Sequence, residues 1–253
     1  MIIYGTTYDE SETAFIKENN LGVEVLQYSN PLFADAFEQN HPQITEYISG
    51  ASAVSMHGAY HDTFYASVDP LICEVAKKRF LQSIEIATFH GINHVVFHSS
   101  YRQFLNGSSA IASDVFVKTS VAFWDDMKKH IPKNMTIYLE NVEDADPELF
   151  LQVLDGIASQ QIRCCFDIGH AYFNGRDVSL NRWIDVLRDH IRYVHVHDND
   201  GMFDDHLPLG QGSILLPGAI NKIMHAAGED IPFILECNIQ ESVKWLRDIG
   251  YEI

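Results

Sequence analysis

Short apolar runs alternate with longer amphipathic stretches along the whole of this 253-residue chain. The runs are nearly continuous in Val, Ile, Leu, Phe and Tyr, which is typical of parallel strands covered on both faces. Eight runs predict strands, at Ile2–Gly5, Gly22–Gln27, Ala53–His57, Asn93–His98, Thr136–Glu140, Ile162–Asp167, Arg192–His197 and Pro232–Glu236. Parallel strands need long crossovers between them, so the intervening stretches decide the fold class.

Those stretches have the apolar spacing of helices and residues typical of helix boundaries. Pro147 stands at a predicted first turn, and Gly91 follows a predicted C-terminus. Eight helices are predicted, at Glu10–Asn19, His41–Ser49, Pro70–His90, Ser113–His130, Glu148–Ala158, Leu180–His190, Gly218–Ala227 and Gln240–Ile249. The alternation predicts an α/β fold, a single (β/α)8 TIM barrel with residues 1–253 as one domain. A doubly wound sheet is the alternative, but it leaves eight strands harder to place.

Composition narrows the classes of function. The chain has 17 basic and 35 acidic residues, a net charge of −18, so general binding to nucleic acid is not expected. No apolar run approaches membrane-spanning length, and the first residues lack the features of a signal peptide. The four cysteines form no Cys-x-x-Cys pair; three of them lie in strand-like runs and predict buried thiols, and disulfides are not expected. We therefore expect a cytoplasmic protein without membrane attachment, and homo-oligomerisation stays open.

The predicted strand ends carry the candidate chemistry, because the reactive face of this barrel lies at the C-terminal ends of the strands. Strands three to eight all end on nitrogen or oxygen donors, namely His57, His98, Glu140, Asp167, His197 and Glu236. Any one of these residues alone is more typical of a hydrogen-bonded structural role. Six converging donors would repel one another or stay unpaired without cations, so the set predicts a divalent-metal site.

Three further donors follow the strand ends. His170 comes three residues after the sixth strand, and Asp204 and His206 lie in the long loop after the seventh. Alone, a helix N-cap explains His170, and a solvated loop explains Asp204 and His206, as well as a ligand role does, but beside the other six donors we favour a ligand role. His195 shares a strand face with His197 and is expected either to support the ligands or to pack in the core.

These motifs resemble the xylose-isomerase-like superfamily of metal-dependent barrels, which includes sugar isomerases, 3-epimerases and the endonuclease IV family. The resemblance rests on His57, His98, Leu139-Glu140-Asn141, Phe166-Asp167-Ile168-Gly169-His170, His197-Asp198-Asn199-Asp200 and Leu235-Glu236. The sugar-acting members imply one metal, zinc or manganese, held by Glu140, Asp167, His197 and Glu236. Endonuclease IV implies three zinc ions, with further ligands at His57, His98, His170, Asp204 and His206.

The surface departs from the DNA-acting members of that superfamily. Tyr60 matches an aromatic residue that they insert into DNA, yet residues 1–78 contain three lysines and no arginine. Only a few basic residues, such as Arg102 and Arg176, lie near the predicted mouth loops. Duplex DNA is therefore not the expected substrate.

The mouth loops supply candidate substrate contacts. Aromatic residues follow the ligands and would form walls for sugar rings, with Tyr60, Tyr101, Tyr172 and Phe203 as the candidates. Apolar cover of the barrel top is an equally good explanation. The segment 210–213, Gly-Gln-Gly-Ser, predicts either a phosphate-binding loop or a plain tight turn.

The leading hypothesis is a metal-dependent isomerase or epimerase of carbohydrate metabolism that acts on a sugar or sugar phosphate. As in the epimerases it resembles, Glu140 and Glu236 would remove and return a proton beside metal-bound oxygens. The alternative is a trinuclear zinc phosphoesterase with endonuclease IV-type chemistry on a small phosphoester. A barrel that binds metal and sugar without catalysis is the lesser alternative.

Overall fold

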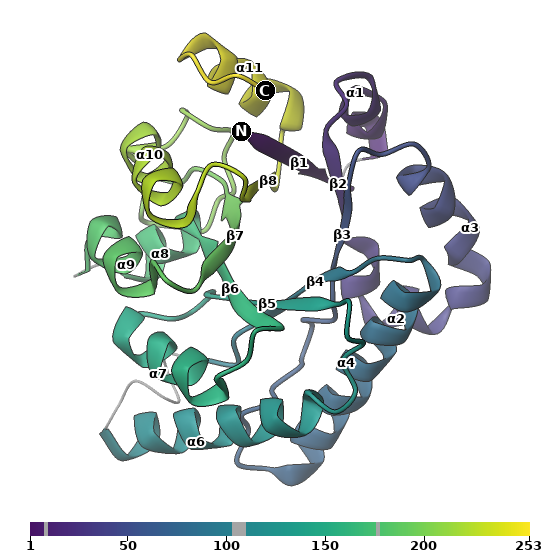
Figure 1. Ribbon diagram of the computed structural model, residues 1–253, viewed down its shortest axis with the longest axis vertical. Helices are drawn as coiled ribbons and strands as arrows, with labels where there is room; N and C mark the ends of the chain where they lie inside the picture. The colour runs from purple at the N-terminus through teal and green to yellow at the C-terminus, as the bar shows by residue number, and fades with distance from the viewer. Residues whose placement is uncertain (8–9, 103–109, 176–177) are drawn as a thin grey trace.

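The computed structural model describes residues 1–7, 10–102, 110–175 and 178–253. Eight parallel strands form a closed barrel in the order β1 to β8, and β1 pairs with β8 (Figure 1). The strands are β1 Ile2–Thr6, β2 Gly22–Val25, β3 Val54–His57, β4 His94–His98, β5 Thr136–Glu140, β6 Ile162–Asp167, β7 Ile191–Val196 and β8 Pro232–Leu235. The predicted (β/α)8 barrel is confirmed.

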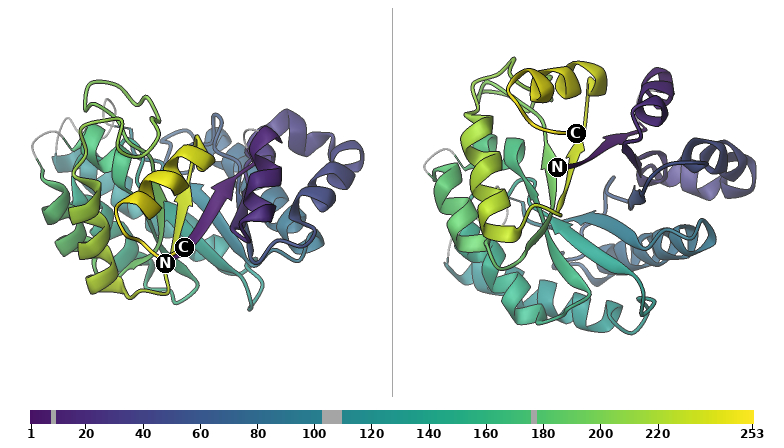
Figure 2. Two further views of the ribbon diagram at one scale, coloured as in Figure 1. Left: turned by 90° about the horizontal axis from the view of Figure 1, so that it is seen from above. Right: turned by 45° about the horizontal axis from the view of Figure 1, so that its top comes forward.

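Helices surround the strands as an outer ring, and the loop after β7 rises above the strand ends (Figure 2). The α-helices of the described residues are α1 Thr13–Glu18, α2 Pro31–Asp35, α3 Phe37–Ile48, α4 Pro70–Phe89, α6 Ala110–Met127, α7 Pro147–Ile157, α8 Ile168–Asn174, α9 Leu180–Leu187, α10 Leu216–Ala227 and α11 Ile239–Asp248. Two short 3-10 turns, Glu10–Glu12 and Gln27–Ser29, precede α1 and α2. None of the described helices is long and apolar enough to cross a membrane.

Three helical regions differ from the prediction, and one of them is α2, which lies in a segment where no helix was predicted. Helix α3 begins four residues before the predicted start, and it accommodates Pro42 in its second turn. Helix α8 lies where the sequence predicted a loop, because the Asp167 carboxylate accepts a hydrogen bond from the His170 backbone N–H (2.6 Å) and caps its first turn. With seven residues, α8 is too short to show a helical period in the sequence.

A two-residue period along the strands places the donors. Residues on the inner face form a packed layer across the barrel, made of Tyr4, Val96, Tyr138, Cys165, Tyr193 and Ile234. Two positions later on β4 to β8 come His98, Glu140, Asp167, His195 and Glu236. Since side chains alternate between the faces of a strand, the donors point inward one layer above this floor. The intervening residues, such as Leu139 and Phe166, pack against the helices.

Strand β7 contains a bulge near its start. Ile191 pairs with Cys164 and Tyr193 pairs with Cys165, so Arg192 is an extra residue in the ladder. All four cysteines are free thiols, which agrees with the sequence expectation.

Candidate metal centre

A cavity of about 410 Å³ opens at the C-terminal ends of the strands. Seven of the nine predicted donors line it, namely His57, His98, Glu140, His170, Asp204, His206 and Glu236. Its other walls come from Thr6, Leu26, Tyr60, Val142 and Cys237. The other two predicted donors, Asp167 and His197, are fully buried next to it. The structure therefore brings all nine together, in three neighbouring groups, two of which share Glu140.

The first group joins β3, β4 and β5. His57 Nε2 lies 3.1 Å and His98 Nε2 3.5 Å from Glu140 Oε2. The other nitrogen of His57, Nδ1, lies 2.9 Å from the Gly58 carbonyl oxygen, which orients the ring. Desolvation lowers the pKa of His98 to about 3, so this imidazole is neutral and offers a lone pair to a cation.

The second group is central and contains Glu140, Asp167, His195 and Glu236. One donor atom from each lies within 4.8 Å of the donor atoms of the others. His195 Nδ1 is 3.0 Å from Glu236 Oε1 and 3.4 Å from Glu140 Oε1. His195 therefore contacts these carboxylates directly, at the place that the resemblance gave to His197.

Glu24 completes this group from below and was not predicted as a site residue. Its Oε1 lies 3.0 Å from His195 Nε2, and its Oε2 accepts a hydrogen bond from the Tyr193 hydroxyl (2.7 Å). The residue is fully buried on β2. The prediction considered only the last residue of each strand, so a donor inside a strand was overlooked. The signal was nevertheless present, because a buried strand rarely carries an unpaired carboxylate.

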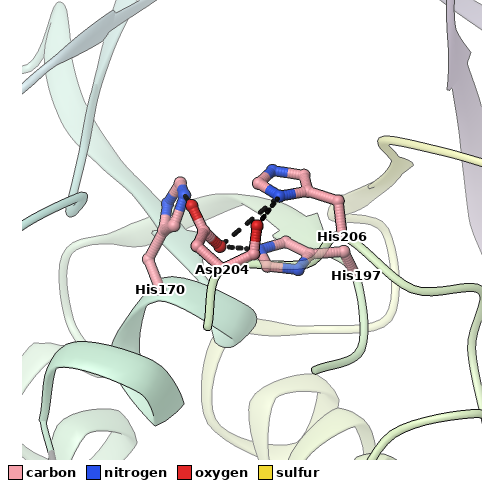
Figure 3. Close-up of side chains that lie close together, drawn as sticks. All are labelled: His170, His197, Asp204 and His206. Atoms are coloured by element: carbon pink, nitrogen blue, oxygen red, sulfur yellow. Dashed lines mark hydrogen bonds and ion pairs between the residues drawn. The ribbon is translucent and has the colours of Figure 1, made fainter. Parts of the chain in front are cut away.

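The third group lies above the central one and contains His170, His197, Asp204 and His206 (Figure 3). His170 Nε2 is 3.3 Å from Asp204 Oδ2, and His206 Nδ1 is 3.4 Å from Asp204 Oδ1. His197 Nε2 lies 3.7 Å from Asp204 Oδ1. Gly169 makes this approach feasible, because a Cβ atom there would lie 2.2 Å from the His197 ring.

Electrostatics in the centre favour ionised carboxylates. Burial alone would raise the pKa of Glu140 and of Glu236, but nearby imidazoles, above all His195, hold both well below the usual range. Conversely, burial would lower the pKa of His195 and of His170, while the surrounding acidic groups raise both well above the usual range. A divalent cation would take over this neutralisation and release the imidazole protons.

Orphaned polar atoms show that the donors fit a cation. Several buried side-chain atoms have no hydrogen-bond partner among the described residues, including Glu140 Oε1, Asp167 Oδ2, His195 Nδ1, His197 Nε2 and Glu236 Oε2. Each is a nitrogen or carboxylate oxygen of the kind that zinc and manganese bind. Unpaired buried donors are costly, and coordination would satisfy them together.

Of the four aromatic candidates, only Tyr60 lines the cavity. Its ring stacks on His98 (centroids 4.6 Å apart) and on His61 (4.3 Å), so both faces are already covered. Tyr101 is buried against Phe116 instead.

The remaining two aromatic candidates lie away from the cavity wall. Tyr172 borders a separate cavity beside α9, and Phe203 is 65% exposed at a loop tip. Tyr60 supports a metal ligand more directly than it could stack on a sugar.

The glycine loop after β7 has a structural explanation. Gly210 has φ +82° and donates its N–H to Asp198 Oδ2 (3.0 Å), and a Cβ atom on Gly212 would lie 2.3 Å from Asp198 Oδ1. The geometry matches the tight turn of the two predicted alternatives. Arg102 pairs with Glu143 and lies over the Phe64 ring, whereas Arg176 lies outside the described residues.

Known proteins share this fold. A crystal structure of a Thermus thermophilus protein soaked with zinc chloride has a TM-score of 0.79 at 20% identity, covering 99% of this chain and 98% of that one. A D-tagatose 3-epimerase-like protein has a TM-score of 0.76 at 23% identity, covering 98% and 96%. Both identities are low, so these likenesses show the fold alone.

Sequence comparison places the chain in a family. A probable endonuclease 4 of Ureaplasma urealyticum is 26% identical over 183 residues, which are 64% of this chain and 58% of that protein. The chain thus spans little more than half of that relative. The family model for the xylose isomerase-like TIM barrel matches residues 17–249, nearly the whole chain. This protein therefore belongs to the xylose isomerase-like TIM-barrel family.

Proposed function

We propose that this protein is a divalent-metal-dependent isomerase or epimerase of a small sugar, with zinc or manganese as the metal. One observation carries the proposal. Two ionised carboxylates, Glu140 and Glu236, face a donor-lined cavity in which no described lining residue is Lys or Arg. A cavity wall without Lys or Arg offers no such side chain to a phosphate group, which favours an uncharged polyhydroxy substrate over a sugar phosphate.

The residues that would hold the central cation are Glu140, Asp167, Glu236 and a histidine of β7, either His195 or His197. When bound, the cation polarises substrate oxygens and makes the neighbouring carbon-bound proton more acidic. Glu140 and Glu236 are the acid–base pair. One carboxylate takes the proton from the carbon beside the carbonyl, and the electron pair moves into that carbonyl. The other carboxyl group enters this step in its protonated form and delivers its proton as the electron pair returns from the oxygen, either to the same carbon on the opposite face, which gives the epimer, or to the former carbonyl carbon, which gives the isomer.

The protein surroundings shield these two carboxylates from bulk water. Glu140 is fully buried, and the Glu236 side chain is 13% exposed. Leu26 and Val142 add apolar wall beside them. In such surroundings a carboxylate is poorly solvated, so its charge has to be balanced by neighbouring groups, here the imidazoles that hold its pKa low or a bound cation.

A zinc-dependent phosphoesterase is the second candidate. It is supported by the complete set of nine donors, which sugar-acting members of the superfamily do not require, and by the similarity to a probable endonuclease 4. The sparse basic charge of the described mouth makes a small phosphoester a better substrate than duplex DNA.

Deuterium exchange separates the two candidates. The metal-loaded protein is incubated in D₂O with a panel of ketoses and aldoses, and NMR follows deuterium uptake beside the carbonyl. We expect uptake with at least one sugar, its loss in Glu236→Gln, and its retention in the exposed control Glu229→Gln. Hydrolysis of bis(4-nitrophenyl) phosphate without exchange of any sugar would instead support the phosphoesterase.

A further inference from the structure

We infer that the N-terminal end of the barrel holds a binding site for a compact phosphate-bearing anion, recognised by the guanidinium groups of Arg163 and Arg192. Both residues line a cavity of about 530 Å³, to which the floor contributes Tyr4, Tyr138 and Tyr193. None of the described residues that line this cavity also lines the one at the mouth. The site is therefore separate from the metal centre, and the inference does not depend on the proposed reaction.

The two-residue period of the strands brings Arg163 to this cavity. Two positions before the floor residues of β1, β4, β5, β6 and β8 stand Ile2, His94, Thr136, Arg163 and Pro232. All five line the cavity. Since side chains alternate between the faces of a strand, Arg163 shares the inward face of Cys165 and lies one layer below it.

On β7 the bulge brings the second arginine to the cavity. The residue two positions before Tyr193 is Ile191, but Ile191 pairs with Cys164 and packs in the core between strands and helices. The extra residue, Arg192, lines the cavity instead. Bulges often redirect a side chain in this way beside a functional site. In a regular strand, Ile191 would occupy this layer and Arg192 would point toward the helices.

The two guanidinium groups have no acidic partner among the described residues. Arg163 donates to the side-chain oxygen of Gln160, and Arg192 donates to the Ile191 carbonyl oxygen (2.6 Å), so both acceptors are neutral. Asp230 lies on the cavity wall but forms no ion pair with either arginine. Because the chain has 35 acidic and 17 basic residues, carboxylates are abundant, and two unneutralised guanidinium groups favour an anion from outside the chain.

Both positive charges lie near one hydroxyl group. Tyr138 pairs with Arg163 in the ladder between β5 and β6. Burial raises the pKa of the Tyr138 hydroxyl, and the charges of Arg163 and Arg192 both oppose this rise. His94 Nδ1 lies 3.0 Å from the same hydroxyl. Two guanidinium groups, a phenol and an imidazole therefore converge, and all are groups that can donate hydrogen bonds to phosphate oxygens.

The cavity favours a compact anion over a nucleotide. Its three tyrosines are at most 7% exposed, because their rings pack on one another. Tyr138 stacks on Tyr193 with centroids 4.6 Å apart, and Tyr4 meets Tyr193 edge-on. The floor therefore offers no open aromatic face on which a base could stack. Recognition would rest on the phosphate group, which the planar forks of the two arginines can bind through paired hydrogen bonds.

The test measures binding of orthophosphate to the metal-loaded protein by isothermal titration calorimetry. Arg163→Gln and Arg192→Gln are compared with the wild type and with Arg188→Gln, which removes the same charge from an exposed position after α9. We expect the wild type and the control to bind alike, and each of the other two variants to bind at least about tenfold more weakly. AMP should bind no more tightly than orthophosphate, because the base finds no stacking partner.

Three results would overturn the inference or its ligand class. A wild type that binds no orthophosphate in the low millimolar range would remove the site. Unchanged affinity in both arginine variants would place the bound anion at the metal centre. Much tighter binding of AMP would identify a nucleotide site instead. If Arg192→Gln does not fold by circular dichroism, Arg192→Lys replaces it, since it keeps the charge and loses the planar fork, and Arg163→Gln decides beside it.

Discussion

The two ends of the barrel are built from the same strands but carry different kinds of inward-facing side chain. At the C-terminal end, inward-facing side chains are His, Asp and Glu, and several of their atoms lack hydrogen-bond partners. At the N-terminal end, Tyr138 stacks on Tyr193 with centroids 4.6 Å apart, and Tyr4 meets Tyr193 edge-on. One step of the two-residue period separates the two layers.

Cavity size does not mark the chemical end of the barrel. The cavity at the N-terminal end measures about 530 Å³ against about 410 Å³ at the mouth. Its polar groups include Arg163 and Arg192, which are bonded to the Gln160 amide oxygen and the Ile191 carbonyl. Convergence of unpaired donors, rather than volume, marks the chemical end.

The comparison predicts its largest effect at Glu140. Glu140→Gln removes a donor shared by two groups, so we expect turnover to fall by about 10³-fold, with loss of bound metal and an unchanged fold. Steady-state rates, metal analysis and circular dichroism measure these effects. Activity within tenfold of the wild type would remove Glu140 from the centre.

Tyr138 lies two residues before Glu140 on β5, and its substitution should lower stability without changing metal binding. Tyr138→Ala removes a ring that is 6% exposed from the floor, and we expect a loss of about 3 kcal/mol in the free energy of unfolding. Urea denaturation measures this loss. The metal content of the folded variant should stay at the wild-type value, and a drop would show that the two layers are coupled.

A substitution of Glu24 tests whether this buried carboxylate positions His195 for metal binding. Glu24→Gln weakens the hold on His195, and we expect zinc affinity to fall by about 10- to 100-fold, the usual effect of losing an outer partner. Ser55→Ala is the matched control, since it removes a 3.3 Å hydrogen bond to Glu24 and keeps the carboxylate. Equal zinc affinities in both variants would contradict a positioning role.

The smallest expected effect is a change in how stability depends on pH, and it comes from Asp144. Burial raises the pKa of Asp144 to about 6, although the Ser99 hydroxyl donates to it and opposes the shift. The folded pKa lies above the unfolded value of 3.8, so the protonated form stabilises the fold. That contribution is complete below about pH 4 and is lost as the pH rises through 6.

Asp144→Asn should therefore flatten this part of the stability profile. We expect the variant to gain on the order of 1–2 kcal/mol relative to the wild type between pH 4 and pH 8. Thermal melts at the two pH values measure the difference. If the difference in stability between the two pH values is the same in the variant and the wild type, the pH dependence comes from other groups.

The donors could be predicted from the sequence because strand ends converge in this barrel and side chains alternate. These two rules were sufficient to predict Asp167 and Glu140 as site residues. The sequence predicts that His195 lies one layer deeper than His197 on the same face, but it could not predict which donors each imidazole meets. Those contacts depend on the tilt and stagger of the closed barrel, which no single strand encodes.

The substrate walls were harder to predict for a related reason. Loop residues such as Tyr101 and Phe203 follow the ligands in sequence, but the packing of the loops buries Tyr101 and leaves Phe203 exposed to solvent. Glu24 was overlooked because it lies inside β2, one residue before the end at Val25, and only the last residue of each strand was considered.

The bulge at Arg192 has a consequence for how this site can evolve. A one-residue slip in a strand turns every side chain to the opposite face, which would send both histidines of β7 toward the helices. The bulge absorbs one residue between the α9 connection and the inward-facing part of the strand. Insertions or deletions in that connection can therefore be accommodated by forming or removing a bulge, while both imidazoles still point into the barrel.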